Sequence, residues 1–260
     1  MKQVPEFLRA ERLGAVPGLI HGFTTRHGGV SQAPFDTANY GLDLDEDPAA
    51  VEENLLRLGR AAGFDAAALR TVQQVHGAEV VRVAAEDAPA TVAQRQADVL
   101  WTDAPGVVLA VRTADCVPIL LADPAARAVA VVHAGWRGTA RRAVARAVDT
   151  LRRTGGIAPR EILAAVGPAI GPCCFEVGDE VVEALRAAVP GPMGDWRRQG
   201  PSGKSHVDLW AANGALLREA GVADVEVVAT CTSCRGDEFF SHRRDRGRTG
   251  RHLAFVGLRS

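Results

Sequence analysis

A chain of 260 residues can bury one large hydrophobic core or two small ones, and it needs no disulfide staples. Hydrophobic residues make up 47% of the chain and charged residues 23%, which are the proportions of an ordinary globular protein. The formal net charge of -1 provides no field of one sign to attract DNA, RNA or an anionic membrane, so we expect no nucleic-acid partner. There is no secretion signal and no long apolar run, so we also expect no membrane partner and a cytoplasmic location.

The first forty residues are rich in loops, with one short strand expected at residues 19–24. Asp47 and Pro48 then open a helix over residues 49–62, in which apolar side chains recur at helical spacing and Gly63 provides the stop. A strand over residues 69–75 is expected to follow.

The middle of the chain holds three apolar, β-branched runs, at residues 107–111, 117–121 and 128–132. We expect three buried, neighbouring strands there. The glycines at 135 and 138 end the last strand, and a helix is expected to start at Thr139 and to run to Arg153.

The second half repeats this alternation of strands and helices. The stretch at 190–203 is rich in glycine and proline and is expected to be an exposed loop. The sequence therefore predicts one α/β domain over residues 1–260, with a mixed β-sheet and flanking helices. The remaining predicted elements are strands at 162–166, 225–229 and 253–256, and helices at 180–188 and 209–220.

Three polar motifs stand at the ends of apolar strands, where α/β proteins form their sites. They are Gln-Val-His-Gly at 74–77, Thr-Ala-Asp-Cys at 113–116 and His-Ala-Gly-Trp-Arg-Gly at 133–138. The thiolate of Cys116 and the imidazoles of His76 and His133 match the preference of zinc for sulfur and nitrogen. Three protein ligands leave a fourth position open, as in catalytic zinc sites, so we expect zinc at these strand ends.

Taken singly, each of these residues has an ordinary structural explanation. His76 could cap a turn, Cys116 could be a small buried hydrophobe, and His133 could donate to a carbonyl. Together with the neighbouring Asp115 and Arg137, they form a group of metal-binding, acidic and basic side chains that is more typical of an active site than of a packed core.

Two further motifs could bind anions. The loop 135–139 offers backbone N–H groups at a helix start with Arg137 among them, although turn formation explains its glycines equally well. Near the C-terminus, residues 239–245 and 249–251 combine arginines and a histidine with two phenylalanines. This second motif could clamp a phosphate and a base, or could be a solvated basic face above core aromatic rings.

The pair Cys231 and Cys234 forms a C-x-x-C motif, which could be redox-active or could be half of a structural zinc site. Cys173 and Cys174, or His242, could complete such a site. Because adjacent cysteines rarely both bind one tetrahedral ion comfortably, we expect buried packing or merely reducible thiols here. The odd total of five cysteines also argues against an exported disulfide scaffold.

The ordered set of motifs resembles the YfiH family, whose members are also called laccase-domain or polyphenol oxidase proteins. The resemblance runs from about residue 20 to 257 and includes Thr-Thr-Arg-His-Gly-Gly-Val-Ser at 24–31, the three strand-end motifs, Gly-Pro-Ala-Ile-Gly at 167–171 and the closing Ser-His-Arg-Arg and Thr-Gly-Arg. It implies an α/β domain with zinc bound by His76, Cys116 and His133, in agreement with the choice made from the residues alone.

The resemblance also implies an enzyme of purine nucleosides. Family members are described as performing phosphorolysis of adenosine, inosine and methylthioadenosine and hydrolytic deamination of adenosine, beside an older claim of copper-dependent phenol oxidation. Multicopper oxidation needs several histidine-rich copper centres, and a chain with seven histidines lacks the ligands for them. We therefore expect zinc rather than copper, with purine nucleosides and phosphate as partners.

Under this hypothesis Asp115 is the candidate proton carrier, or else a group that orients the metal ligands. Arg26, Arg137 and Arg243 are the candidates for binding phosphate and stabilising the leaving purine. Asn39 resembles the family's Asn-Leu-Gly element and is a candidate nucleoside contact, although Tyr40 departs from that element. The alternatives are a copper-dependent polyphenol oxidase and a non-enzymatic, zinc-containing nucleotide-binding module. We expect the protein to be a monomer or a weak homo-oligomer.

Overall fold

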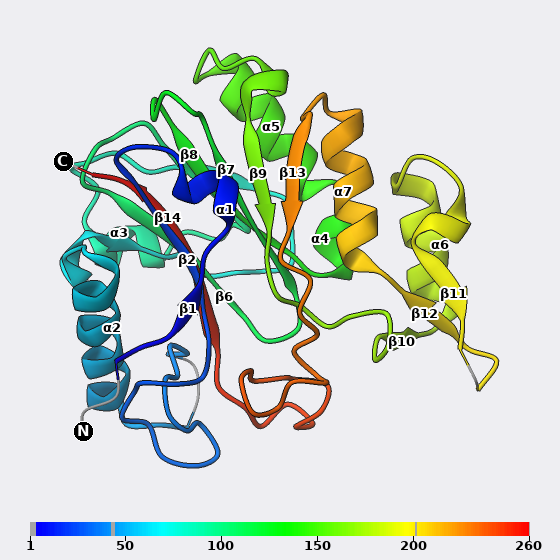
Figure 1. Ribbon diagram of the computed structural model, residues 1–260, viewed down its shortest axis with the longest axis horizontal. Coiled ribbons are helices and arrows are strands. Elements are labelled where there is room, and N and C mark those ends of the chain that lie inside the picture. The colour runs from blue at the N-terminus through cyan, green and yellow to red at the C-terminus, as the bar shows by residue number, and fades with distance from the viewer. Residues whose placement is uncertain (1–3, 43–44, 201, 260) are drawn as a thin grey trace.

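The computed structural model describes residues 4–42, 45–200 and 202–259. It confirms the predicted α/β fold with mixed sheets and helices, and it divides the strands among three sheets. The two larger sheets pack face to face, and helices cover their outer faces (Figure 1).

The first large sheet has five strands. Its order is β1, β2, β14, β6 and β3, so that the last strand of the chain lies in the middle (Figure 1). β3 runs parallel to β6 and the other neighbours are antiparallel, which makes the sheet mixed. The strands are β1 (Phe7–Leu8), β2 (Leu19–Thr24), β14 (His252–Leu258), β6 (Val108–Thr113) and β3 (Leu69–Arg70).

The second large sheet has six strands, in the order β13, β9, β7, β8, β5 and β4. All residues of β7 and β8 are buried, because one face of this sheet packs on the first sheet and the other on helices. Burial on both faces explains why these strands form continuous apolar runs instead of alternating polar and apolar residues. The strands are β13 (Asp224–Val227), β9 (Leu163–Val166), β7 (Val117–Ala122), β8 (Val129–Ala134), β5 (Val99–Thr102) and β4 (Val80–Arg82).

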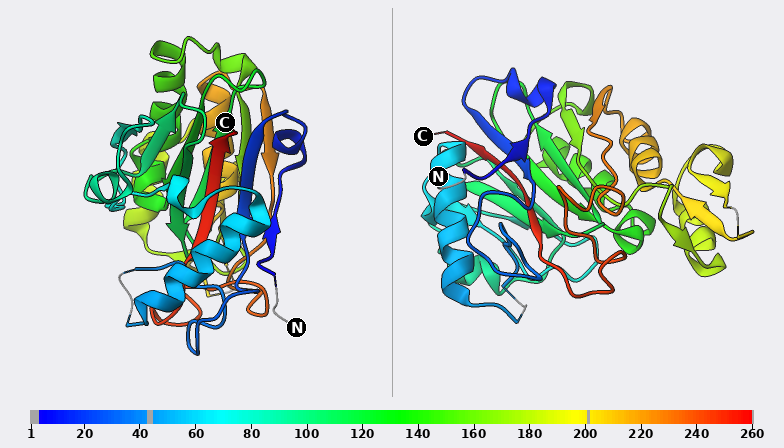
Figure 2. Two further views of the ribbon diagram at one scale, coloured as in Figure 1. Left: turned by 90° about the vertical axis from the view of Figure 1, so that its left-hand side faces the viewer. Right: turned by 60° about the horizontal axis from the view of Figure 1, so that its bottom comes forward.

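Alternate residues of β6 belong to two different hydrophobic cores, one on each face of the five-stranded sheet. Leu109 and Val111 point into the core between the sheets, whereas Val108 and Ala110 pack toward α2 (Pro48–Ala62) on the outer face. α2 begins where the carboxylate of Asp47 accepts a hydrogen bond from the N–H of Ala49, and it ends at Gly63, whose φ of 80° is left-handed. Figure 2 shows α2 lying across this face.

Helices α5 (Ala143–Arg153) and α7 (Leu209–Glu219) cover the outer face of the six-stranded sheet, with α4 (Trp136–Ala140) and α6 (Asp179–Ala188) beside them. Most of the predicted elements are confirmed to within two residues at each end, namely the strands at 19–24, 107–111, 117–121, 128–132, 162–166, 225–229 and 253–256 and the helices at 49–62, 180–188 and 209–220. The remaining helices are α1 (Glu11–Gly14) and α3 (Pro89–Ala93), with 3-10 turns at Ala66–Ala68, Pro159–Glu161 and Met193–Asp195.

Most of the described residues of the stretch at 190–203 are exposed, as predicted, but the prediction that they form a loop was wrong. Arg197–Gln199 forms β11, which pairs with β12 (Ser205–Val207) as a hairpin, and β10 (Glu176–Val177) completes a small three-stranded sheet. Trp196 anchors the hairpin, since its side chain is only 2% exposed. The glycines and prolines in this stretch therefore mark turns within a sheet.

Three other predictions need correction. The strand at 107–111 is not a sheet neighbour of 117–121, because the chain crosses between the two sheets at Asp115, whose φ is 88°. The helix predicted from Thr139 begins earlier, at Trp136, and Arg142 divides it with a left-handed φ of 60°. The strand predicted at 69–75 ends after Arg70.

Within the described residues, none of the helices combines the length and the apolar character that a membrane-spanning helix requires.

Candidate metal centre and cavity

A cavity of about 540 Å³ opens where several strands end, a volume within the range of small-molecule sites. Its lining mixes polar, charged and aromatic side chains from segments far apart in the sequence. The lining residues are Gly41, Leu42, Val72, Gln73, Gln74, His76, Arg112, Thr113, Ala114, Asp115, Cys116, His133, Gly135, Trp136, Ile170, Phe175, Leu209, His242, Arg243 and Arg251.

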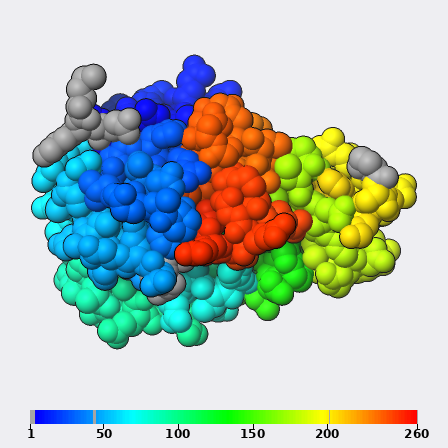
Figure 3. All heavy atoms as spheres, turned by 90° about the horizontal axis from the view of Figure 1, so that it is seen from below, coloured from blue at the N-terminus to red at the C-terminus, as the bar shows by residue number. Residues whose placement is uncertain are grey.

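The loops around the cavity come from distant parts of the chain. Figure 3 shows the C-terminal segment, in orange and red, between the blue N-terminal loops and the yellow-green segment that follows β9. The N–H of Arg26 donates to the carbonyl of Glu238 at 2.9 Å, which ties the first loop to the C-terminal segment.

The three predicted metal ligands meet in this cavity. Cys116 lies in the crossing between β6 and β7, His133 lies near the end of β8, and His76 lies on an exposed turn after β3 with a φ of 56°. Their ligand atoms all lie within 4.8 Å of one another, and the two imidazole rings meet edge to face at 4.8 Å. The structure thus brings together groups that are 40 and 17 residues apart in the sequence.

This donor set fits a single metal ion. Zinc binds thiolate at about 2.3 Å and imidazole nitrogen at about 2.0–2.1 Å, so ligand atoms this close can share one ion after small side-chain adjustments. Gly135 leaves the necessary space, because a Cβ there would lie 2.7 Å from Sγ of Cys116 and 3.4 Å from Cδ2 of His76.

Asp98 is a supporting residue that the sequence reasoning missed. Its fully buried carboxylate lies 2.7 Å from Nδ1 of His133 and accepts backbone N–H bonds from His76 at 3.0 Å and Gly77 at 2.6 Å. It therefore holds two of the three candidate ligands at once. A signal was available, since Asp98 directly precedes the apolar run of β5, and that strand was itself not predicted.

Electrostatics in the cluster favour the charged forms of these groups. Burial alone would raise the pKa of Asp98, but its hydrogen bond with His133 and the positive charge of that residue outweigh burial and lower the pKa. Burial would likewise raise the pKa of the Cys116 thiol, but the charge and hydrogen bond of His133, with a smaller contribution from His76, lower it to about 6.

His133 responds in the opposite sense. Burial would lower the pKa of its imidazole, but the charge of Cys116 and the hydrogen bond that the imidazole donates to Asp98 raise it to about 9. The pair is therefore poised as thiolate and imidazolium, and a cation bound between them would take over the role of the imidazolium proton.

Asp115 lines the cavity but has both carboxylate oxygens engaged. Oδ1 accepts from the hydroxyl of Thr232 at 2.6 Å, and Oδ2 accepts from the N–H of Arg243 at 2.6 Å. These contacts tie the β6–β7 crossing to the C-terminal segment. They provide a positioning role for Asp115, in addition to the predicted proton transfer.

Of the three arginines predicted for phosphate, only Arg243 lines the cavity, where its guanidinium lies 5.3 Å from the Phe175 ring. Arg112 and Arg251 also line it. Arg112 was not singled out from the sequence, because a single arginine within a predicted strand usually indicates no more than a side chain that faces solvent.

The other predicted residues lie away from the cavity lining. Arg26 stacks over Phe240 and binds the backbone of Asp36 and Gly236. Exposed Arg137 lies over the Trp136 ring at 4.3 Å, so it touches a cavity residue without lining the cavity itself.

Asn39 is fully buried, and its side chain forms hydrogen bonds with backbone groups instead of lining the cavity. Its Oδ1 accepts from the N–H of Gly41 at 2.9 Å and from the N–H of Arg251 at 2.7 Å, and both of those residues line the cavity. Its contact with the cavity is therefore indirect.

The fold and the cavity together define an α/β protein with a candidate site for one metal ion at strand ends. A family model described as multi-copper polyphenol oxidoreductase laccase matches residues 20–259, and the chain belongs to this family.

Similar proteins match almost the whole chain. The purine nucleoside phosphorylase YlmD of Geobacillus stearothermophilus is 43% identical over 259 residues, covering 95% of this chain and 94% of that protein. A purine nucleoside phosphorylase of Deinococcus radiodurans is 44% identical over 254 residues, covering 96% and 92%.

The crystal structure of the hypothetical protein YfiH of Bacillus licheniformis matches with a TM-score of 0.92 and 35% identity, covering 98% of this chain and 97% of that one. These findings confirm the resemblance to the YfiH family.

Proposed function

We propose that this chain is a zinc-dependent purine nucleoside enzyme that cleaves adenosine, inosine and methylthioadenosine with phosphate. The observation that carries the proposal is one cavity that contains three metal-capable side chains together with three arginines. The names of the curated relatives support an enzyme of this class.

The arginines suit the anionic co-substrate. The cavity lining contains three arginines, Arg112, Arg243 and Arg251, against one acidic residue, Asp115. Planar guanidinium groups bind phosphate through paired hydrogen bonds and stabilise charge that develops as the base leaves. The carboxylate of Asp115 would repel phosphate, but its negative charge is partly offset by the hydrogen bonds that it accepts from the hydroxyl of Thr232 and the N–H of Arg243.

The aromatic residues suit the nucleobase. Trp136 and Phe175 both line the cavity, and each ring carries an arginine over one face. A purine ring can stack on such aromatic surfaces. We therefore propose that the base lies against one of these rings.

His76, Cys116 and His133 would hold the zinc ion. When bound with three protein ligands, zinc supplies Lewis-acid chemistry at its open fourth position, including a lowered pKa for water. Asp98 accepts the hydrogen bond from Nδ1 of His133, which leaves Nε2 of the same ring as the ligand atom. The tautomer and the direction of His133 are thus set by the protein.

Hydrolytic deamination of adenosine is proposed as a second activity of the same site. The supporting observation is a donor set of three protein ligands that opens into a cavity of nucleoside size. Asp115, on the cavity surface beside Cys116, is the candidate carrier of the proton that reaches the leaving ammonia.

Copper-dependent oxidation of phenols is the alternative that the family description suggests. Two imidazoles and a thiolate also occur in blue-copper sites, which add a weak axial ligand that is often methionine, and multicopper enzymes need further histidine-rich centres. Among the described residues, the two groups of metal-capable side chains contain only two histidines, and the cavity lining contains no methionine. The donors therefore favour zinc.

Product identification tests the proposal. Zinc-loaded protein is incubated with adenosine, with and without phosphate, and the products are separated by chromatography. We expect adenine and ribose phosphate only when phosphate is present, inosine when phosphate is absent, and inosine together with its cleavage product hypoxanthine when phosphate is present. Unchanged adenosine in all samples would contradict both activities and would favour the non-enzymatic, nucleotide-binding alternative.

A further inference from the structure

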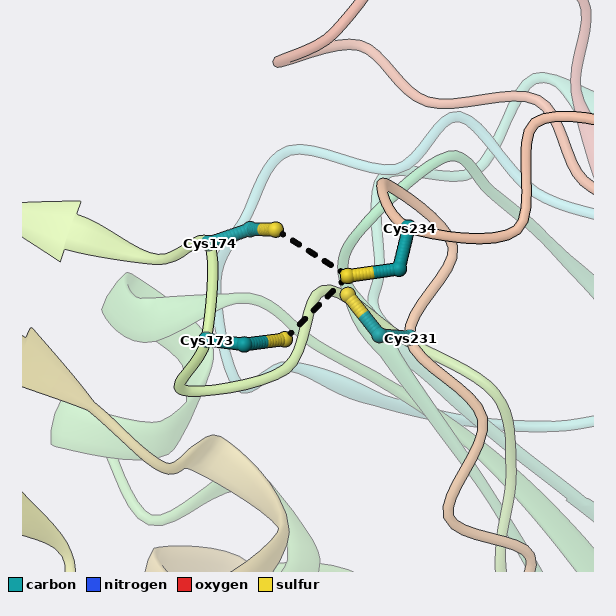
Figure 4. A group of neighbouring side chains, drawn as sticks. All are labelled: Cys173, Cys174, Cys231 and Cys234. Atoms are coloured by element: carbon teal, nitrogen blue, oxygen red, sulfur yellow. Dashed lines mark hydrogen bonds between the residues drawn. The ribbon is translucent and has the colours of Figure 1, made fainter.

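The four remaining cysteines form a second group of metal-capable side chains, which we term the four-cysteine cluster. Their sulfur atoms all lie within 4.8 Å of one another. Figure 4 shows the side chains of the adjacent Cys173 and Cys174 reaching from one loop toward the C-x-x-C turn that carries Cys231 and Cys234.

The four sulfurs converge on a common centre instead of forming two separate pairs. Sγ of Cys234 lies 3.4 Å from Sγ of Cys173 and equally 3.4 Å from Sγ of Cys174, so neither is a preferred partner. In a tetrahedral site with zinc–sulfur bonds of about 2.3 Å, neighbouring sulfurs lie roughly 3.8 Å apart. The spacing of the cluster is close to that of such a site.

The structure corrects the expectation of buried packing thiols. Cys173 and Cys234 are exposed and Cys174 and Cys231 are half-buried, so none of the four is a core residue. The expected difficulty of using adjacent cysteines also disappears, because the turn from Gly171 to Cys174, closed by a 2.9 Å backbone hydrogen bond, directs both side chains toward the same partners.

We propose that the four-cysteine cluster binds one zinc ion as a four-thiolate structural site, distinct from the centre at His76, Cys116 and His133. The two sites share no residue. Four thiolates complete a tetrahedron around zinc and leave no open position, as in sites that stabilise structure. Exposure of two of the sulfurs gives the ion a path of entry.

Backbone groups already favour a thiolate within the cluster. The N–H of Gly171 donates to Sγ of Cys231 at 3.2 Å, a contact of the kind that surrounds metal-bound sulfur.

A zinc ion in the four-cysteine cluster would connect two segments that are far apart in the sequence. It joins the segment between β9 and β10 to the segment between β13 and β14, where Ala169 and Cys231 also form an isolated parallel bridge. The first segment supplies Ile170 and Phe175 to the cavity lining, and the second supplies Arg243. A zinc ion would therefore fasten two walls of the cavity to each other.

Metal counting tests the proposal without reference to activity. Protein stripped with a chelator and reloaded with Zn²⁺ is analysed by native mass spectrometry and by elemental analysis. We expect two zinc ions per chain in the parent, one in the Cys173→Ser/Cys234→Ser variant and one in the Cys116→Ala variant. A parent with a single zinc that Cys116→Ala removes would overturn the proposal.

Cobalt gives a test that leaves the cluster intact. In the Cys116→Ala variant loaded with Co²⁺, the only remaining thiolates are those of the four-cysteine cluster, and we expect strong sulfur-to-cobalt charge-transfer absorption from a tetrahedral ion. The same spectrum should disappear on adding the Cys173→Ser and Cys234→Ser changes. Absence of the charge-transfer band in Cys116→Ala, or recovery of the four thiols as two disulfides after purification under reducing conditions, would contradict zinc binding.

Discussion

Replacement of Asp98 by asparagine tests how far the metal centre depends on its buried support. The carboxylate accepts hydrogen bonds from the N–H groups of Val75, His76 and Gly77 and from Nδ1 of His133, at distances from 2.6 to 3.2 Å. An amide keeps one acceptor oxygen but turns its NH₂ group toward donors, so about two of these bonds are lost. Each unpaired buried donor costs about 1–3 kcal/mol, which gives a destabilisation of roughly 2–6 kcal/mol.

The same change should weaken zinc binding by about 10- to 100-fold, because His133 loses the anion that fixes its tautomer and direction. Urea unfolding measures the stability, and competition with a chelator measures the zinc affinity. Asp103→Asn is the matched control. Asp103 follows β5, which Asp98 precedes, but its carboxylate is exposed, and its one ion-pair partner among the described residues is Arg82. If Asp98→Asn kept parental stability and zinc affinity, the account of Asp98 as the support of two ligands would be refuted.

Four further outcomes are expected. Gly135→Ala should lower zinc affinity by at least about tenfold by chelator competition, because its Cβ would lie 2.7 Å from Sγ of Cys116, whereas Gly194→Ala, which meets no atom within 4 Å, should have no effect. Arg243→Ala should raise the KM for phosphate by at least about tenfold in steady-state assays, and Arg137→Ala, outside the cavity lining, should change it by less than about threefold; equal effects would contradict the choice of Arg243. Asp115→Asn should retain its zinc and lose deamination by at least about a hundredfold if it carries the proton, and a deamination rate close to that of the parent would remove it from the mechanism. Finally, burial lowers the pKa of His252 to about 3, so stability is highest above about pH 6.5, where the imidazole is neutral, and falls as pH drops toward 3. Between pH 6.5 and pH 4.5 the unfolding free energy of the parent should fall by about 2 kcal/mol more than that of His252→Gln, and identical pH profiles would contradict this assignment.

The sequence predicted the parts of this fold that depend on local patterns. The continuous apolar runs of β7 and β8, and the helix between Asp47 and Gly63, were recognisable because burial and capping leave direct marks on residue type. The short β4 and β5 were missed, since brief strands are hard to distinguish from buried loops. The division into two large sheets was also missed, because it depends on one reversal at Asp115 that the residue type does not announce.

The site could be predicted only in part, for the same reason. His76, Cys116 and His133 are residue types that bind metals, and they stand at strand ends, so their grouping could be proposed before any coordinates. Asp98 looks like an ordinary polar residue beside a strand, and its role arises only when the fold buries it beneath His133. The convergence of the four-cysteine cluster likewise depends on two loops about 60 residues apart meeting in space.

The proposed function is tested most directly by following radiolabelled phosphate. Zinc-loaded parent protein and its Cys116→Ala variant are incubated with inosine and the labelled phosphate, and ribose phosphate is separated from the reaction. The account predicts that the parent transfers label to ribose phosphate in a one-to-one ratio with released hypoxanthine and that the variant transfers none. Release of hypoxanthine without transfer of label, or equal transfer by both proteins, would contradict a phosphorylase that depends on this metal centre.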